Sequence, residues 1–176
     1  MDSIRTKTTD KTLTLRTPCE TDGADVWELV RNCKPLDENS MYCNIIQCDH
    51  FAETCVVAEL DGKMVGWISA YLVPSDPDTL FIWQVAVAPE ARGHGVGVRM
   101  LKDILERDVT SDVERLHTTI TDDNDASWAL FRKFSRLNGG DLRSQSQYTK
   151  DQHFQDRHSS ENLVIIELPE ALARAA

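Results

Sequence analysis

The sequence predicts an α/β protein built on one mixed β-sheet of about seven strands, with helices on both faces. Short apolar, β-rich runs alternate along the chain with longer segments whose apolar residues recur at spacings of three and four. A glycine-rich stretch, residues 92–97, joins the most apolar strand to one of these helices. Strand, helix, strand and helix in succession favour a sheet that is partly parallel and covered on both sides.

Length and composition limit what the 176-residue chain can be. We expect one domain over residues 1–176, with a loose polar arm at 1–10 and a tail at 169–176. The net charge of −10 disfavours nucleic acid and anionic membranes as partners, and no apolar run is long enough to span a bilayer. Five cysteines without a Cys-x-x-Cys pair, and no apolar leader, predict reduced thiols in the cytoplasm and no metal site.

The first third of the chain predicts a strand and two helices. Apolar and polar residues alternate over 13–16, which is typical of a strand. A helix is expected to begin at Thr21 or Asp22, either of which suits the capping position, and to end near Asn32. A second, shorter helix is expected over residues 41–48.

The remaining elements follow from the same patterns. A strand is expected over 54–60, a tight hairpin turn at Asp61-Gly62, a partner strand over 63–73, a loop over 74–78 and a central strand over 79–88. Beyond the glycine-rich stretch we expect a helix over 98–108, a strand over 115–121, a helix over 126–136, a strand over 142–148, a polar loop over 151–160 and a last strand over 163–168.

The glycine-rich stretch predicts an anion site. It reads Arg92-Gly93-His94-Gly95-Val96-Gly97-Val98 and follows Val85-Ala86-Val87 at the end of the central strand. The first N–H groups of a helix have no internal partner, and the helix dipole makes that end positive. Glycines let a phosphate approach the backbone closely, and Arg92 adds a positive charge. The spacing fits neither the dinucleotide-binding fingerprint nor the P-loop.

The pattern Arg92-x-x-Gly95-x-Gly97 after Val-Ala-Val-x-Pro resembles the pyrophosphate loop of the GNAT superfamily of acyl-CoA-dependent N-acetyltransferases. The resemblance extends from about residue 12 to residue 168. It implies the GNAT fold, in which the central strand and the strand after its helix splay apart to hold acetyl-CoA. The residues that it assigns to acetyl-CoA are Val85, Ala86, Val87, Arg92, Gly93, His94, Gly95, Val96, Gly97, Val98, Asn124 and Phe131. By itself, Asn124 also suits the capping of a helix.

Two positions depart from the family's pattern. Phe131 stands where many members carry a tyrosine that protonates the departing thiolate. Ser127, another residue or water must then serve, or the thiolate leaves unprotonated. Residues 80–84 hold no carboxylate, whereas some relatives carry a catalytic glutamate there. The general base must therefore come from elsewhere or act through water.

The acceptor amine has a pKa of about 10 and must lose a proton before it attacks the thioester. By residue type, the candidates for the proton acceptor are Asp37, Glu38, Tyr42, Glu53, His158 and Glu161. The GNAT fold brings the helix–helix loop, the central strand and the late hairpin to one cleft. The resemblance therefore implies catalytic roles for Asp37, Tyr42, His158 and Glu161, and substrate binding by these four residues with Trp83. Each of them, taken alone, also suits an ordinary surface or core position.

The whole chain is also similar to the diaminobutyrate acetyltransferases of ectoine synthesis. The stretches that carry this similarity are residues 16–18, 32–42, 81–85 and 119–127. It implies acetyl transfer to the γ-amine of L-2,4-diaminobutyrate by direct attack on the thioester, in a cytoplasmic homodimer that makes a compatible solute under osmotic stress. Two alternatives stay open. The acceptor is another amine, such as a polyamine or an amino acid, or the chain is a catalytically silent sensor of acetyl-CoA.

Overall fold

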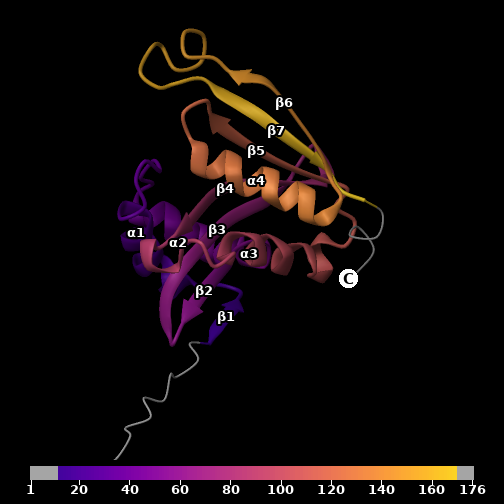
Figure 1. The fold of residues 1–176 in the computed structure, drawn as a ribbon. Helices are drawn as coiled ribbons and strands as arrows, with labels where there is room; N and C mark the ends of the chain where they lie inside the picture. The colour runs from indigo at the N-terminus through magenta and orange to yellow at the C-terminus, as the bar shows by residue number, and fades with distance from the viewer. Residues whose placement is uncertain (1–11, 170–176) are drawn as a thin grey trace, which may run out of the picture.

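The computed structural model describes residues 12–169, which form one seven-stranded sheet with four α-helices and short 3-10 turns (Figure 1). The strands are β1 (Leu13–Arg16), β2 (Val56–Leu60), β3 (Lys63–Val73), β4 (Asp76–Val87), β5 (Arg115–Thr121), β6 (Asp141–Tyr148) and β7 (Glu161–Glu167). The helices are α1 (Gly23–Arg31), α2 (Met41–His50), α3 (Val96–Leu105) and α4 (Asp125–Asn138). The expected arm at 1–10 and the tail beyond residue 169 lie outside the described residues, and a single domain over the whole chain stays a prediction.

The strand order is β1-β2-β3-β4-β5-β7-β6, and neighbouring strands are antiparallel except β4 and β5. These two run parallel and pair only from Thr79 opposite Arg115 to Ile82 opposite Thr118. Beyond that point they separate, and Figure 1 shows β2–β4 diverging from β5–β7. The end of β4 is therefore left without a strand partner on its β5 side. The predicted mixed sheet and the splayed central strands are confirmed.

Between Ile82 and Gln84, the strand β4 holds one residue more than β3 offers partners for. The register passes from Ile82 opposite Ala70 to Gln84 opposite Ser69, so Trp83 is the extra residue of a β-bulge. Side chains alternate between the two faces of a strand, and the extra residue resets this alternation. Gln84 therefore faces the opposite side of the sheet from Ile82, although the two are separated by a single residue.

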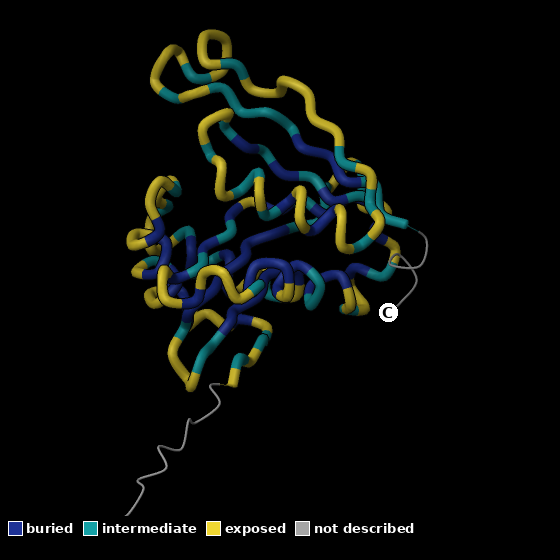
Figure 2. Tube along the Cα trace, viewed as in Figure 1, coloured by how far each residue is buried: buried dark blue, intermediate teal, exposed yellow. Residues whose placement is uncertain are grey.

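Helices cover both faces of the sheet, as the sequence predicts. The helix α1 packs on β3 and β4 and against α2, whereas α3 packs on β2, β3 and β4 and against α4 (Figure 1). The largest fully buried side chains include Trp67 of β3, Leu101 and Ile104 of α3, and Phe131 and Phe134 of α4. Figure 2 shows this buried zone along the middle strands and the inner faces of the helices. The predicted apolar spacing of three and four thus marks the core-facing side of α3.

Several boundaries differ from the expectations. The strand β4 begins at Asp76, inside the expected loop over 74–78. Pro77 lies where the β3–β4 register is irregular, so its missing N–H weakens no regular ladder. The helix α3 spans Val96–Leu105 rather than 98–108.

The start of α1 also differs from the expectation. Neither Thr21 nor Asp22 caps α1 with its side chain, because a 3-10 turn over Glu20–Asp22 leads into the helix. The Asp22 carboxylate instead accepts hydrogen bonds from the guanidinium of Arg16, at 2.7 and 2.8 Å. This ion pair holds the pKa of Asp22 below its usual range.

Candidate active site

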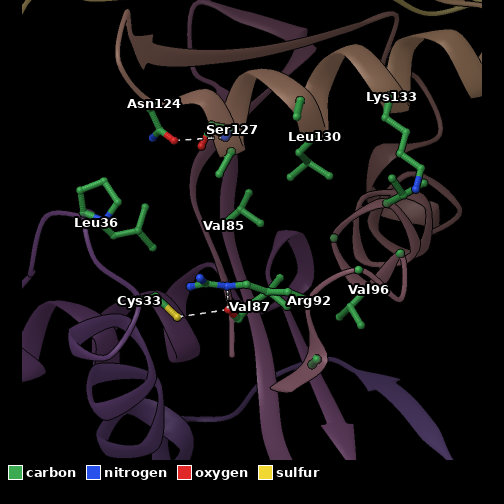
Figure 3. A pocket seen from close by; sticks show the side chains of 18 of the residues that line it. Cys33, Leu36, Val85, Val87, Arg92, Val96, Asn124, Ser127, Leu130 and Lys133 are labelled. Atoms are coloured by element: carbon green, nitrogen blue, oxygen red, sulfur yellow. Dashed lines mark hydrogen bonds between the residues drawn. The ribbon is translucent and has the colours of Figure 1, made fainter. Parts of the chain in front are cut away.

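A cleft of about 370 Å³ opens where β4 leaves β5, between the β4–α3 loop and α4 (Figure 3). We call it the loop cleft. Of the residues expected to bind acetyl-CoA, it is lined by Val85, Val87, Arg92, Gly93, Gly95, Val96, Gly97, Val98 and Asn124. Three other expected residues do not line it: Ala86 is fully buried, His94 lies outside the lining, and Phe131 lines an adjoining cleft.

The backbone of the loop presents N–H groups to this cleft. Gly93 and Gly95 have φ values of +80° and +73°, in the left-handed region that favours glycine. The α3 ladder begins with Arg99 N–H donating to Gly95 O at 3.0 Å, so the N–H groups of residues 96–98 have no acceptor within the helix. A Cβ on Gly93 or Gly95 would meet nothing within 4 Å. The open, positive helix end suits a diphosphate.

Gly97 serves packing rather than backbone conformation. A Cβ at this position would lie 3.0 Å from Cδ1 of Leu130, so the glycine lets α4 approach the first turn of α3. The close approach brings the α4 side of the loop cleft near the N-terminus of α3. The third glycine of the motif therefore shapes the cleft.

Three cationic side chains line the loop cleft: Arg92, Lys34 and Lys133. Arg92 Nε donates to Val87 O at 3.0 Å, and Figure 3 shows its guanidinium extended across the cleft. Lys133 projects from α4 towards the start of α3 in the same view. Sequence reasoning missed both lysines. The signal for Lys133 was its place on the same helix face as Leu130, three residues earlier.

A second cleft of about 510 Å³ adjoins the first. We call it the acceptor cleft. Both clefts are lined by Pro35, Leu36, Val85, Asn124 and Ser127, so they meet in the gap between β4 and β5. The acceptor cleft brings together four of the five residues expected to bind the substrate, namely Asp37, Trp83, His158 and Glu161. Tyr42 is 72% exposed and lines neither cleft, so the structure does not bring it to the site.

Asp37 and His158 meet at the rim of the acceptor cleft. His158 Nε2 lies 3.1 Å from Asp37 Oδ2, and its Nδ1 lies 2.7 Å from the carbonyl oxygen of Ser159. An imidazolium donates from both nitrogens, which matches two oxygen partners. The Ser159 carbonyl and the negative charges of Asp37 and Glu161 raise the pKa of His158. The geometry therefore favours a positively charged ring.

Glu161 is the half-buried carboxylate of the acceptor cleft. Its Oε2 is buried and has no hydrogen-bond partner among the described residues. Burial raises the pKa of Glu161, and the charges of Asp37 and Asp123 raise it further against the opposing effects of His158 and Thr119. A carboxylate that lines the cleft and has a raised pKa is suited to receive a proton from a bound ammonium group.

Asn124 and Phe131 lie where α4 borders both clefts. Asn124 Oδ1 accepts a hydrogen bond from Ser127 N–H at 3.1 Å, which confirms that Asn124 caps α4 (Figure 3). Phe131 is 1% exposed and is one of the residues that line the acceptor cleft. The Ser127 hydroxyl lies at the junction of the clefts, where Phe131 offers no proton. Sequence reasoning missed Asn39, Gln84, Asp123 and Arg157, which also line the acceptor cleft.

Among residues 12–169, no group of three or more His, Cys, Asp and Glu side chains is placed to hold a metal ion. No helix in that part of the chain has the length and apolar character needed to cross a bilayer.

The chain belongs to the acetyltransferase (GNAT) family, whose sequence pattern matches residues 23–135. More narrowly, it is 48% identical over 160 residues to the L-2,4-diaminobutyric acid acetyltransferase of Methylotuvimicrobium alcaliphilum, covering 91% of this chain and 93% of the relative. It is 45% identical over 153 residues to the enzyme of that name from Vibrio parahaemolyticus, covering 87% of this chain and 84% of the relative.

Solved structures agree with these relatives. Diaminobutyrate acetyltransferase EctA from Paenibacillus lautus, in complex with its substrate L-2,4-diaminobutyric acid and coenzyme A, matches with a TM-score of 0.85 and 34% identity. The match covers 90% of this chain and 96% of EctA. Ard1 from Thermoplasma volcanium matches with a TM-score of 0.69 at 18% identity over 89% of this chain and 99% of its own, which shows the shared fold.

Proposed function

We propose that this protein transfers the acetyl group of acetyl-CoA to the γ-amine of L-2,4-diaminobutyrate, giving Nγ-acetyl-diaminobutyrate for the synthesis of the compatible solute ectoine. One observation carries the proposal. The loop cleft, which is built for a polyphosphate anion, opens directly into a cleft lined by carboxylates that suit a diamine. The family, the diaminobutyric acid acetyltransferase relatives and the likeness to EctA support the same reaction.

The loop cleft fits coenzyme A as the acyl carrier. The free N–H groups at the start of α3 and the cations Arg92, Lys34 and Lys133 would hold its phosphates. The edge of β4 that β5 leaves uncovered, at residues 85–87, would hydrogen-bond the amides of the pantetheine arm. When bound, acetyl-CoA supplies the activated acetyl group as a thioester.

The acceptor cleft would hold a small zwitterion that carries a second ammonium group. Asp37 and Glu161 are placed for its amines, and protonated His158 with Arg157 for its α-carboxylate. The exposed face of Trp83 is available to a cation. Anchoring the α-amino acid end would separate the γ-amine from the α-amine by position.

Glu161 is the proposed general base. Its carboxylate lines the acceptor cleft and would take the proton from the γ-ammonium, and its raised pKa lies closer to the pKa of the amine than an ordinary carboxyl pKa does. The raised pKa of His158 beside Asp37 favours its charged form, which would act through electrostatics and hydrogen bonding. The position of Tyr42 outside both clefts gives no support to a catalytic role for it.

The proposal is tested by measuring thiol release from acetyl-CoA with a panel of amines. We expect diaminobutyrate to be preferred over ornithine, which is one methylene longer, by about 10–200-fold in kcat/KM. Preference for ornithine or a polyamine would move the function to another acceptor. Binding of CoA without turnover of any amine would instead indicate the silent sensor.

We further propose a homodimer in the cytoplasm that serves the response to osmotic stress. The exposed aromatic side chains of Phe51 and Tyr148, which line neither cleft, offer apolar surface that a partner subunit would cover. The five cysteines are all free thiols, which suits a reducing compartment. Analytical ultracentrifugation tests the subunit number, and a monomer at micromolar concentration would contradict the homodimer.

A further inference from the structure

The side chain of Gln84 makes two hydrogen bonds to the loop between α1 and α2. It is 7% exposed on β4 and lines the floor of the acceptor cleft. Its Nε2 donates to the carbonyl oxygen of Asp37 at 2.7 Å, and its Oε1 accepts from Asn39 Nδ2 at 3.1 Å. The nitrogen and the oxygen of one carboxamide are therefore both hydrogen-bonded, to Asp37 and Asn39, which lie 47 and 45 positions away in the chain.

The bulge at Trp83 is what turns Gln84 to this side of the sheet. In an unbroken alternation, Gln84 would face the same way as Ile82. The extra residue instead pairs Gln84 with Ser69 and points it away from the Ile82 side. The bulge and the carboxamide thus act together to tie the central strand to the α1–α2 loop.

Asp37 depends on this anchor for its position. Its side chain is 79% exposed and reaches His158, while its backbone lies in a loop outside any helix or strand. An exposed carboxylate on an unanchored loop would sample many positions, and ordering it would lower the binding energy left for substrate. The Gln84 hydrogen bond fixes the peptide group of Asp37 directly.

We propose that Gln84 is a positioning residue: it holds the Asp37–Asn39 segment so that Asp37 meets His158 and the rim of the acceptor cleft is formed before substrate arrives. The inference rests on the proposed function, because the kinetic consequence is read on the amine substrate. Gln84 carries no charge and has no expected role in proton transfer, so its role at the amine site would be to hold the loop in place. The loss of Gln84 should thus affect the amine and leave the loop cleft unchanged.

The kinetic test compares Gln84→Leu with Gln47→Leu. Gln47 is a matched control, since it is a glutamine only 2% exposed, lies on α2 and lines neither cleft. For Gln84→Leu we expect the KM for diaminobutyrate to rise about tenfold, with the KM for acetyl-CoA within about twofold of wild type. For Gln47→Leu we expect both KM values to stay near wild type. Equal changes in the two variants, or an unchanged amine KM in Gln84→Leu, would overturn the proposal.

A second readout needs no substrate. The pKa of His158, followed by NMR in the free protein, should fall in Gln84→Leu because Asp37 no longer stays beside the ring. Asn39→Ala, which removes one of the two hydrogen bonds at a half-buried position, should lower it less and keeps the test open if Gln84→Leu does not fold. An unchanged His158 pKa in both variants would contradict the positioning role. If wild type fails to acetylate diaminobutyrate, the proposed function fails, and this NMR measurement still decides the role of Gln84.

Discussion

His158 Nε2 and Asp37 Oδ2 lie 3.1 Å apart although 121 positions separate the two residues, so the β6–β7 loop and the α1–α2 loop meet at the acceptor cleft. An ion pair this exposed adds little to stability, at most about 0.5–1 kcal/mol. We therefore expect the main role of this ion pair to be in substrate binding. Asp37→Asn should raise the KM for diaminobutyrate about tenfold, as measured by steady-state kinetics.

The pH dependence of stability gives that variant an internal check. The pKa of His158 is raised in the folded protein, so the pair stabilises the fold below the ordinary histidine pKa and loses this effect as pH rises through the raised value. Urea denaturation should show a slightly lower free energy of unfolding for Asp37→Asn than for wild type at pH 6, and no difference at pH 9. A deficit that is the same at both pH values would contradict a charged His158.

Glu161 should set the lower limb of the pH–rate profile. The group acts as a base only when ionised, and burial places its pKa above the ordinary carboxyl value, so kcat/KM should rise with pH through that raised pKa. The charge of His158 lowers the pKa of Glu161, so His158→Gln should move the limb to higher pH. Glu161→Gln should lower kcat by about 100-fold or more while CoA binding is kept. A limb that moves to lower pH in His158→Gln would exclude Glu161 as the base.

Gly95→Ala tests the anion site, with Gly62→Ala as its control. Both glycines have positive φ, of +73° and +78°, and open space at the Cβ position, so each variant should lose about 1–2 kcal/mol of stability. Of these two glycines, Gly95 lines the loop cleft and Gly62 does not. Calorimetric titration should therefore show CoA affinity reduced about tenfold in Gly95→Ala and unchanged in Gly62→Ala. Equal affinities in the two variants would remove the phosphate assignment.

Local sequence patterns predict most elements of this fold, because each depends on neighbours in the chain. The Asp61-Gly62 turn follows from residue types that adopt positive φ, and the buried side of α3 follows from apolar spacing. The bulge at Trp83 depends on pairing with β3, which the sequence of β4 alone does not contain. Asp22 likewise has the residue type of a cap, but Arg16, folded against it, takes its carboxylate.

In the candidate site, too, residues of a local motif are predicted from the sequence, whereas residues brought together from distant segments are not. Eight of the nine expected residues that line the loop cleft fall within residues 85–98, so one local motif predicts them, whereas His94 belongs to the motif but lies outside the lining. The acceptor cleft is assembled from segments far apart in the chain. Residue type alone pointed equally to Tyr42 and to Glu161, and the fold separates them. Gln84 carries no signal of its own, because its role depends on a neighbouring bulge.

Phe131→Tyr tests whether thiolate protonation limits the rate. The native ring is buried and offers no proton, so an added hydroxyl should change single-turnover thiol release by less than about tenfold, equivalent to roughly 1.4 kcal/mol in the barrier. Phe134→Tyr is the matched control, since it makes the same change in a fully buried ring of α4 that lines neither cleft. A rate of thiol release that rises well above tenfold in Phe131→Tyr, but not in Phe134→Tyr, would show that protonation of the leaving thiolate limits the rate of the native enzyme.

The position of the acetyl group in the product tests the proposed reaction most directly. Wild-type protein is incubated with acetyl-CoA and L-2,4-diaminobutyrate, and the acetylated nitrogen is identified by two-dimensional NMR. The arrangement of the acceptor cleft predicts Nγ-acetyl-diaminobutyrate as the main product, with its formation strongly reduced in Glu161→Gln. Acetylation at the α-amine, or full activity in Glu161→Gln, would contradict the account.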